Sequence, residues 1–243
     1  MPKKLDGLVG VITGAGSGIG AAIARDLGSA GMRLVLVGRR LEPLSERAAE
    51  VEAKGGSAVA VSADMRTYED ADRAIGVALE RWGKVDVLIP NAAIADYGPI
   101  AQADPALLRD VVETNLIGVM FAVRAALPHM EARRSGHIAI VSSASGRVTY
   151  VGEPAYVASK HGTVAFAECL RQEVAATGIR VSLIEPGLVE TPLIHVYPEA
   201  NDLVPGVIAL DPDDIDRAVR YVLEQPDNVN VFEVLLRPTG QLL

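Results

Sequence analysis

The chain has 243 residues, of which 49% are hydrophobic, so it is long enough to bury a sizeable core in one large domain. Aromatic residues make up only 4%, which leaves mainly aliphatic side chains to fill that core, a mixture suited to a parallel sheet covered by helices. The net charge of −8, with no dominant basic patch, argues against nucleic acid as a partner.

The single cysteine, Cys169, excludes a disulfide within the chain and fits a reducing compartment. We interpret it as part of a helix core rather than as a nucleophile. The first residues, 1–7, lead directly into a short apolar strand, and no apolar segment is long enough for a signal peptide or a membrane span. We therefore expect a cytoplasmic protein.

The first predicted strand, Leu8–Ile12, ends at a glycine-rich turn, 13–20, and an apolar helical pattern follows over Ala21–Ala30. Glycines let the backbone approach a bound group, and the first turn of a helix offers N–H donors and a positive dipole end to a diphosphate. This context of strand, glycine turn and helix predicts a dinucleotide site rather than a purely structural turn. The expected contacts come from Gly14, Ser17, Gly18, Ile19 and Gly20.

The second predicted strand, Arg33–Val37, is followed by Gly38, Arg39 and Arg40. In sheets of this kind an acidic residue at that place would accept hydrogen bonds from the adenosine ribose of NAD(H). Two arginines without a carboxylate instead favour NADP(H), because a guanidinium can bind the 2′-phosphate. The alternative is that both arginines only begin the solvated surface of the next helix.

That helix is predicted over Leu41–Lys54, and the third strand over Ala58–Ser62. Asp64 follows at the carboxyl end of the strand, where its carboxylate could accept from the adenine amino group, with the Met65 backbone beside it. Alternatively, Asp64 is the N-cap of the next helix, predicted over Tyr68–Trp82.

The fourth predicted strand, Val85–Ile89, runs into Pro90–Ala93, where Asn91 and Ala92 would meet the cofactor. A long helical stretch follows over Asp104–Met130, with an aspartate cap and a proline at the first helical position. It contains Asn115 among apolar residues, and a buried amide must find partners. Either Asn115 bonds backbone locally, or it holds a water near an active site.

The fifth predicted strand, His137–Val141, leads to Ser143, which is placed to donate to a substrate oxygen at the carboxyl edge of the sheet. On the following helix, Tyr156 and Lys160 lie four positions apart and so share one face. A fixed ammonium near a phenol favours the phenolate and should lower its pKa, making the pair a candidate acid and base. The alternative is two ordinary surface residues.

The last elements are a sixth strand at Ile179–Ile184, a helix from Asp211 to about Glu224 and a seventh strand at Val231–Leu236. Between them, 192–210 appears as an irregular loop of the kind that often covers a substrate, and we leave its His195 without a role. The alternation of strand and helix predicts a Rossmann-type, doubly wound α/β fold with a parallel seven-stranded sheet, forming one domain over 1–243.

Taken together, these motifs resemble the short-chain dehydrogenase/reductase family over nearly the whole chain. Tyr156 follows Ser143 by 13 positions (156 − 143), as the family pattern requires. The markers are the glycine turn 13–20, Asn91–Ala93, Asn115, Ser143, the segment Tyr156–Lys160, and Pro186 and Gly187 with Thr191.

The resemblance implies a role for each marker. Tyr156 exchanges the proton with the substrate oxygen, Ser143 polarises the carbonyl, and Asn115 positions a water of the proton relay. Lys160 lowers the pKa of the phenol and holds the nicotinamide ribose. Further cofactor contacts would come from Pro186, Val189 and Thr191, and no metal site is expected.

Two departures from the family pattern stand out. The loop after the fourth strand has Pro90 and Ala93 where Asn and Gly are usual, and we expect a small local shift of the cofactor contacts there. The tail, 233–241, differs from that of fatty-acid ketoacyl reductases and is more similar to the branch of clavaldehyde reductases and 3-hydroxy-acid dehydrogenases.

The sequence thus predicts an NADP(H)-dependent oxidoreductase acting on a carbonyl or secondary alcohol of a small molecule, assembled as a homotetramer as the family implies. The alternatives are a cofactor-binding sensor or scaffold without turnover, and a reductase for carrier-linked substrates docked by Arg133 and Arg134. The expected substrate pocket is apolar with few charges. Its expected lining is Ile94, Ala144, Tyr150, Val151 and the 192–210 loop.

Overall fold

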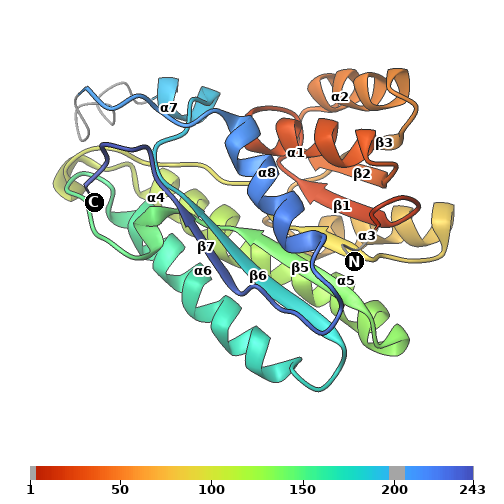
Figure 1. The fold of residues 1–243 in the computed structure, drawn as a ribbon. Coiled ribbons are helices and arrows are strands. Elements are labelled where there is room, and N and C mark those ends of the chain that lie inside the picture. The colour runs from red at the N-terminus through yellow and green to blue at the C-terminus, as the bar shows by residue number, and fades with distance from the viewer. Residues whose placement is uncertain (1–3, 197–205, 243) are drawn as a thin grey trace.

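A computed structural model describes residues 4–196 and 206–242, and it shows a seven-stranded sheet in which every strand pairs in parallel, with the order β3-β2-β1-β4-β5-β6-β7 (Figure 1). The predicted fold class is confirmed. The strands are β1 Val9–Thr13, β2 Arg33–Gly38, β3 Ser57–Ser62, β4 Val87–Ile89, β5 Gly136–Val141, β6 Ile179–Pro186 and β7 Glu233–Leu236.

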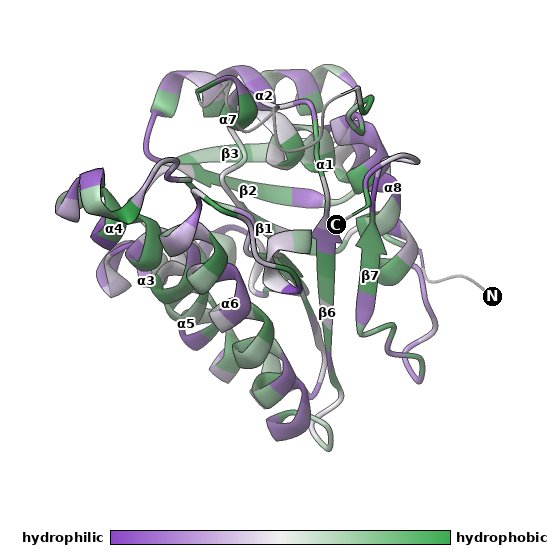
Figure 2. Cartoon of the chain, turned by 90° about the vertical axis from the view of Figure 1, so that its left-hand side faces the viewer, coloured by the Kyte–Doolittle hydropathy of each residue, from purple (hydrophilic) through white to green (hydrophobic). Residues whose placement is uncertain are grey.

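Helices cover both faces of the sheet, which makes a three-layer molecule (Figures 1 and 2). On one side lie α1 Gly18–Ser29, α2 Leu41–Ala53 and α8 Pro212–Leu223. On the other side lie α3 Tyr68–Trp82, α4 Pro105–Val112, α5 Gly118–Arg133 and α6 Pro154–Glu173. Two short 3₁₀ turns, Ile100–Gln102 and Ala144–Gly146, lie in the loops after β4 and β5. In the described part of the chain, no helix combines the length and apolar character needed to span a membrane.

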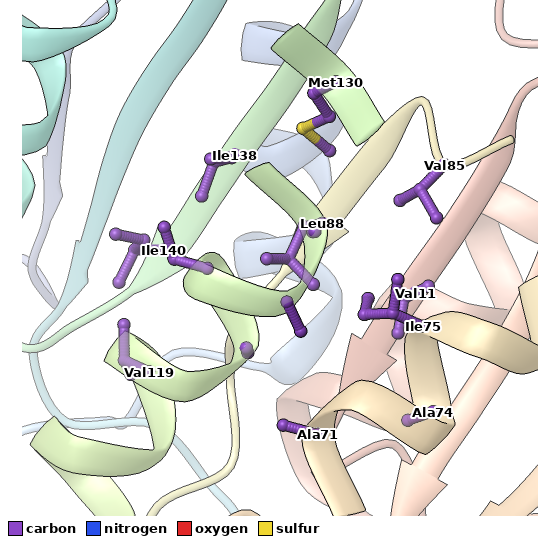
Figure 3. Close-up of a cluster of buried hydrophobic side chains, with 14 of the residues drawn as sticks. Val11, Ala71, Ala74, Ile75, Val85, Leu88, Val119, Met130, Ile138 and Ile140 are labelled. Atoms are coloured by element: carbon purple, nitrogen blue, oxygen red, sulfur yellow. The ribbon is translucent and has the colours of Figure 1, made fainter. Parts of the chain in front are cut away.

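Two hydrophobic clusters, one on each face of the sheet, hold the layers together. Figure 3 shows part of the cluster beneath α3 and α5, where Leu88 and Ile138 of the sheet meet Ile75 and Val119 of the helices. Hydrophobic residues run along the strands, while the outer faces of the helices are largely polar (Figure 2). Because parallel strands are buried on both faces, their sequences are continuous aliphatic runs rather than alternating ones.

The structure corrects two of the predicted elements. The helix expected over Asp104–Met130 is interrupted by a π turn, Glu113–Ile117, which separates α4 from α5. The stretch expected to be irregular from 192 begins with a short helix, α7 Pro192–Val196, while Tyr197 and the residues to 205 lie outside the described chain.

Cys169 is a third correction, because it is exposed on α6 rather than part of a helix core. Its neighbour Leu170 is buried, so only some of the apolar residues around Cys169 point toward the sheet. One position along a helix turns a side chain by about 100°, enough to move it from the core to solvent.

The strand order places β1 between β2 and β4. Successive strands are added on one side of β1 up to β3 and on its other side from β4 onward, and this switch opens a crevice at the carboxyl ends of β1 and β4. The glycine turn after β1 packs against that crevice. Gly14 has φ +68, and a Cβ there would lie 2.8 Å from Ala92 Cα. A Cβ on Gly20 would lie 2.3 Å from the Gly14 carbonyl oxygen and 2.6 Å from Asn91 Nδ2. Backbone and amide therefore leave no room for a methyl group at either position.

We predict that Gly20→Ala lowers the thermal stability, because the new methyl group displaces the Gly14 carbonyl and the Asn91 amide. Overpacking of this kind costs about 1–3 kcal/mol. The matched control is Gly76→Ala on α3, where nothing lies within 4 Å of the added Cβ. That substitution should leave stability unchanged or raise it by about 0.4–1 kcal/mol. Equal melting temperatures for the two variants would contradict the prediction.

Candidate active site

Thr13 and Asn91 tie the glycine turn to the end of β4. The Thr13 hydroxyl accepts hydrogen bonds from the Asn91 and Ala92 N–H groups, each at 3.0 Å. In return the Asn91 side-chain amide donates to the Thr13 carbonyl at 3.0 Å and to the Gly14 carbonyl at 3.3 Å. Asn91, predicted as a cofactor contact, therefore also holds the turn in place. Thr13 is a residue that sequence reasoning missed.

A cavity of about 580 Å³ runs along the carboxyl edge of β1, β2 and β4. At one end lies the start of α1, whose first turn has no acidic residue and whose N-cap, Ser17, makes no side-chain capping bond. The backbone N–H groups and the positive dipole end are thus available to an anion. The predicted cofactor residues in the lining are Gly14, Ser17, Gly18, Ile19, Arg39, Arg40, Asp64, Met65, Asn91, Ala92, Tyr156, Lys160 and Thr191.

Arg39 and Arg40 are exposed at the rim of this cavity, and neither forms an ion pair with a described residue. Asp64 is engaged by Arg66, whose guanidinium holds its carboxylate at 2.7 Å and keeps the pKa of Asp64 low. The alternative of an N-cap at Asp64 is wrong, because α3 begins after Thr67. The open arginines and the cavity fit a phosphorylated dinucleotide.

Three predicted cofactor residues lie outside that cavity lining. Gly20 packs beneath the turn, while Pro186 and Val189 line a second, adjoining cavity of about 160 Å³. Thr191 contributes to both cavities, and its methyl group would be 3.2 Å from a Cβ on Gly18. His195, left without a role, pairs with exposed Glu190 and lines neither cavity.

Asn115 is fully buried in the π turn and binds backbone that is distant in sequence. Its side chain accepts from the Ile94 N–H at 2.9 Å and donates to the Ile94 carbonyl at 2.8 Å and to the Ser159 hydroxyl at 3.1 Å. Its own carbonyl accepts from the Thr163 hydroxyl at 3.1 Å. Of the two alternatives for Asn115, local bonding is therefore wrong, because its side chain joins the loop after β4 to α6.

Tyr156 lies where the two cavities meet and lines both of them. Ser143 lines the smaller cavity, is buried, and hydrogen-bonds to the phenol. Its hydroxyl also accepts from the Ser145 N–H at 3.0 Å, which orients it. A phenol and a serine hydroxyl therefore converge on one point at the carboxyl edge of the sheet, as the motif spacing predicts.

Lys160 lies 5.6 Å from the centre of the Tyr156 ring and donates to the Val141 carbonyl at 3.4 Å. The expectation that this ammonium lowers the pKa of the phenol is wrong for the protein alone. Burial raises the pKa of Tyr156 to about 12, and a nearby carboxylate at Glu153 adds to the increase, against the hydrogen bond to Ser143. Burial also lowers the pKa of Lys160 to about 8, since both charged forms lose water.

The smaller cavity has a mainly apolar lining with few charges, as the sequence led us to expect, but it also holds two carboxyl groups that sequence reasoning missed. Asp96 and Glu153 line it, together with Tyr97, Tyr150 and Gln241. The predicted lining residues Ala144 and Tyr150 are present, but Ile94 lines the larger cavity and Val151 is 90% exposed. Asp96 was missed because its loop carries no motif, and it approaches the cavity only when the loop folds against α6.

Arg133 and Arg134 lie at the end of α5, near the start of β4 and therefore at the opposite edge of the sheet from the cavities. Arg133 donates to the Val85 carbonyl at 3.0 Å and pairs with Asp86. Arg134 has φ +50 at the helix end and donates to the Ala176 carbonyl at 3.0 Å. Both arginines are engaged by other segments of the chain, which speaks against a docking role for carrier-linked substrates.

Comparison with known proteins places this geometry in a family. The model of the short chain dehydrogenase family matches residues 9–202. An uncharacterised oxidoreductase of Staphylococcus saprophyticus is 35% identical, over 97% of this chain and 99% of its own length. Glycine betaine reductase of Emericella nidulans is 32% identical over 99% of this chain, but the match covers only 19% of that longer protein.

Two solved structures share the fold over almost their whole length. A metagenomic short-chain oxidoreductase in complex with NADP is 34% identical, covers 98% of this chain and 100% of its own, and superposes with a TM-score of 0.85. The actinorhodin polyketide ketoreductase with NADPH is 33% identical, covers 98% of both chains, and has a TM-score of 0.89.

Glu153 generates a pH-dependent prediction, because burial and the charge of Asp96 raise its pKa from 4.5 to about 7. The folded protein then binds a proton more tightly than the unfolded chain, so stability falls as pH rises from about 4.5 to about 7. Glu153→Gln, which mimics the neutral form, should raise the melting temperature at pH 8 by about 2–4 °C for ~1 kcal/mol, and should have little effect at about pH 4, below the unfolded pKa. Exposed Glu173→Gln on the same helix is the control. The same shift at both pH values would show that ionisation of Glu153 is not the cause.

Proposed function

This chain belongs to the short chain dehydrogenase family and is an oxidoreductase, and we propose that it transfers a hydride between NADP(H) and the carbonyl or secondary alcohol of a small molecule. The observation that carries the proposal is the convergence of Tyr156 and Ser143 at the junction of a long cavity and a small one. One cavity has the length and the N–H donors for a dinucleotide, and the other has the size of a small substrate.

NADP(H) is proposed over NAD(H) because no carboxylate follows β2, where Arg39 and Arg40 stand at the cavity rim. A ribose 2′-phosphate would bind these guanidinium groups, whereas a 2′-hydroxyl would gain little from them. The two structural neighbours solved with NADP and NADPH support the same choice.

The cofactor would lie with its diphosphate at the start of α1 and its nicotinamide near Thr191 and Tyr156. When bound, it supplies the hydride, and the protein supplies position and electrostatics. Lys160, on the wall of the larger cavity, is placed to hold a ribose hydroxyl there. Its pKa of about 8 leaves the ammonium mostly protonated at pH 7, so it remains a hydrogen-bond donor.

Tyr156 would exchange the proton with the substrate oxygen, and Ser143 would polarise that oxygen by hydrogen bonding. The phenol's pKa of about 12 keeps it protonated at neutral pH, which is the form that donates a proton when a carbonyl is reduced. Asn115 would act as a positioning residue, because it ties Ser159, between Tyr156 and Lys160 on α6, to the loop after β4.

We further propose a homotetramer, as the family resemblance implies, and a cytoplasmic location. Leu235 on the edge strand β7 is 46% exposed and Tyr221 on α8 is 54% exposed, so apolar side chains are available for contact with another copy. Light scattering that gives the mass of one 25.6 kDa chain would exclude the tetramer. The lone Cys169 thiol, exposed and without a second cysteine in the sequence, fits a reducing compartment.

The proposed reaction predicts that Tyr156→Phe lowers kcat/KM by about 10²–10⁴-fold, because it removes the proton donor. The affinity for NADPH should change little, since the ring remains. The assay is oxidation of NADPH with a panel of ketones and aldehydes, and binding is measured separately by calorimetry. The control is Tyr221→Phe on α8, which is exposed and remote from the cavities. Undiminished turnover in Tyr156→Phe would remove this residue from the mechanism.

The cofactor proposal predicts that Arg39→Asp lowers the ratio of kcat/KM for NADPH over NADH by at least about tenfold, because a carboxylate repels the 2′-phosphate and accepts from a ribose hydroxyl. Arg33→Asp is the matched control, since it makes the same charge change at the exposed opposite end of β2. A ratio unchanged in Arg39→Asp would mean that this arginine does not recognise the phosphate.

A further inference from the structure

The small cavity beside Tyr156 is acidic at one end, a feature that the proposed reaction does not use. Asp96, only 5% exposed, reaches it from the loop after β4, and Glu153 reaches it from the position that begins α6. Ser143 and Tyr156 line the same cavity of about 160 Å³. Whatever substrate presents its carbonyl to these two hydroxyls therefore also lies close to two carboxyl groups.

The two acidic residues are held by contacts between their loops. Asp96 accepts a hydrogen bond from the Tyr156 N–H at 2.9 Å, so it caps the start of α6 from outside the helix. The Gly98 N–H donates to the Gly152 carbonyl at 2.7 Å, and a Cβ on Gly152 would meet the Tyr97 ring at 3.2 Å. This packing fixes the acidic end of the cavity relative to the phenol.

Glu153 itself is left without a partner of opposite charge. Within the described part of the chain no hydrogen bond or ion pair reaches its carboxylate, and it does not cap α6 with its side chain. The Glu153 carboxyl is partly buried, and this burial together with the charge of Asp96 raises its pKa to about 7, because the charged form loses water without gaining a donor. A role limited to starting the helix would leave this burial unexplained.

No lysine, arginine or histidine is among the described residues that line the cavity. Arg237 lies behind its wall, where its charge acts on Tyr150, and the Tyr156 N–H at the start of α6 donates to Asp96. The other polar groups of the lining are serine and threonine hydroxyls, the Gln241 amide and three tyrosines, Tyr97, Tyr150 and Tyr156. Aromatic rings attract cations through their faces, so carboxylates and rings together favour a ligand with a positive charge.

We propose that the substrate is a compact carbonyl compound carrying an ammonium group, and that Glu153, supported by Asp96, selects it. The inference rests on the proposed function, since it assumes that the carbonyl meets Ser143 and Tyr156. Glu153 is the N-cap of α6, three positions before Tyr156, and both side chains line the same cavity of about 160 Å³. The charged nitrogen and the carbonyl are therefore separated by only a few bonds.

The test compares two aldehydes of nearly the same shape, betaine aldehyde, which has a trimethylammonium group, and 3,3-dimethylbutanal, which has a neutral tert-butyl group. The quantity is the ratio of kcat/KM for the cationic over the neutral aldehyde, with NADPH. Glu153→Gln should lower this ratio by about 10–100-fold, because it removes the charge while keeping the shape. Differences in hydration between the aldehydes cancel when the ratios of variant and parent are compared.

Two further variants make the kinetic result specific. Glu173→Gln, on the exposed face of α6, removes the same charge outside the cavity and should leave the ratio unchanged. Asp96→Asn keeps an oxygen that can accept from the Tyr156 N–H and should lower the ratio as well, so it replaces Glu153→Gln if that variant fails to fold. A ratio within twofold of the parent in both cavity variants would overturn the proposal.

A binding experiment separates this inference from the proposed reaction. Calorimetry on the complex with NADPH compares choline with its neutral analogue 3,3-dimethylbutan-1-ol. Choline should bind at least about tenfold more tightly to the parent, and this preference should disappear in Glu153→Gln. If neither aldehyde is reduced but the preference is found, the proposed reaction fails and the cation site stands. Equal affinity of the two alcohols for the parent would overturn the cation site whatever the kinetics show.

Discussion

The side chain of Asn115 is the contact on which the geometry of the cleft depends. It pairs with both the N–H and the carbonyl of Ile94 and also reaches Ser159, so three segments far apart in sequence meet at one buried amide. The π turn makes this possible by changing the helical register, and the Asn115 carbonyl then accepts from Thr163. Because Ser159 lies between Tyr156 and Lys160, the amide fixes both of them relative to the loop that lines the two cavities.

Burial shifts the pKa of Tyr156 and that of Lys160 more strongly than any neighbouring charge does. In the protein alone the phenol of Tyr156 and the ammonium of Lys160 are both shifted toward their neutral forms, and Lys160 is not among the groups that shift the phenol. The ammonium donates to the Val141 carbonyl instead. Burial of the phenol thus keeps it protonated at neutral pH.

Charge is divided along the cleft. Arg39 and Arg40 stand at the far end of the large cavity, where a phosphate would bind, while Asp96 and Glu153 stand in the small cavity. The first pair follows a strand and faces solvent, whereas the second pair comes from two loops pressed together. A long ligand with a negative end and a small ligand with a positive group would therefore each find an opposite charge. The described residues that line both cavities are Ile19, Ser142, Tyr156, Thr191 and Leu193.

The amino-acid sequence alone determined the seven strands, the helices between them, the glycine turn and the spacing from Ser143 to Tyr156 and Lys160, because each depends on local periodicity or on a short motif. The tertiary structure decided the partner of Asn115, the exposure of Cys169, the pKa of Tyr156 and the meeting of Asp96 with Glu153. These depend on which loops pack together and how much water they exclude. Side chains far apart in the chain come into contact only after folding, so no spacing along the sequence predicts these contacts.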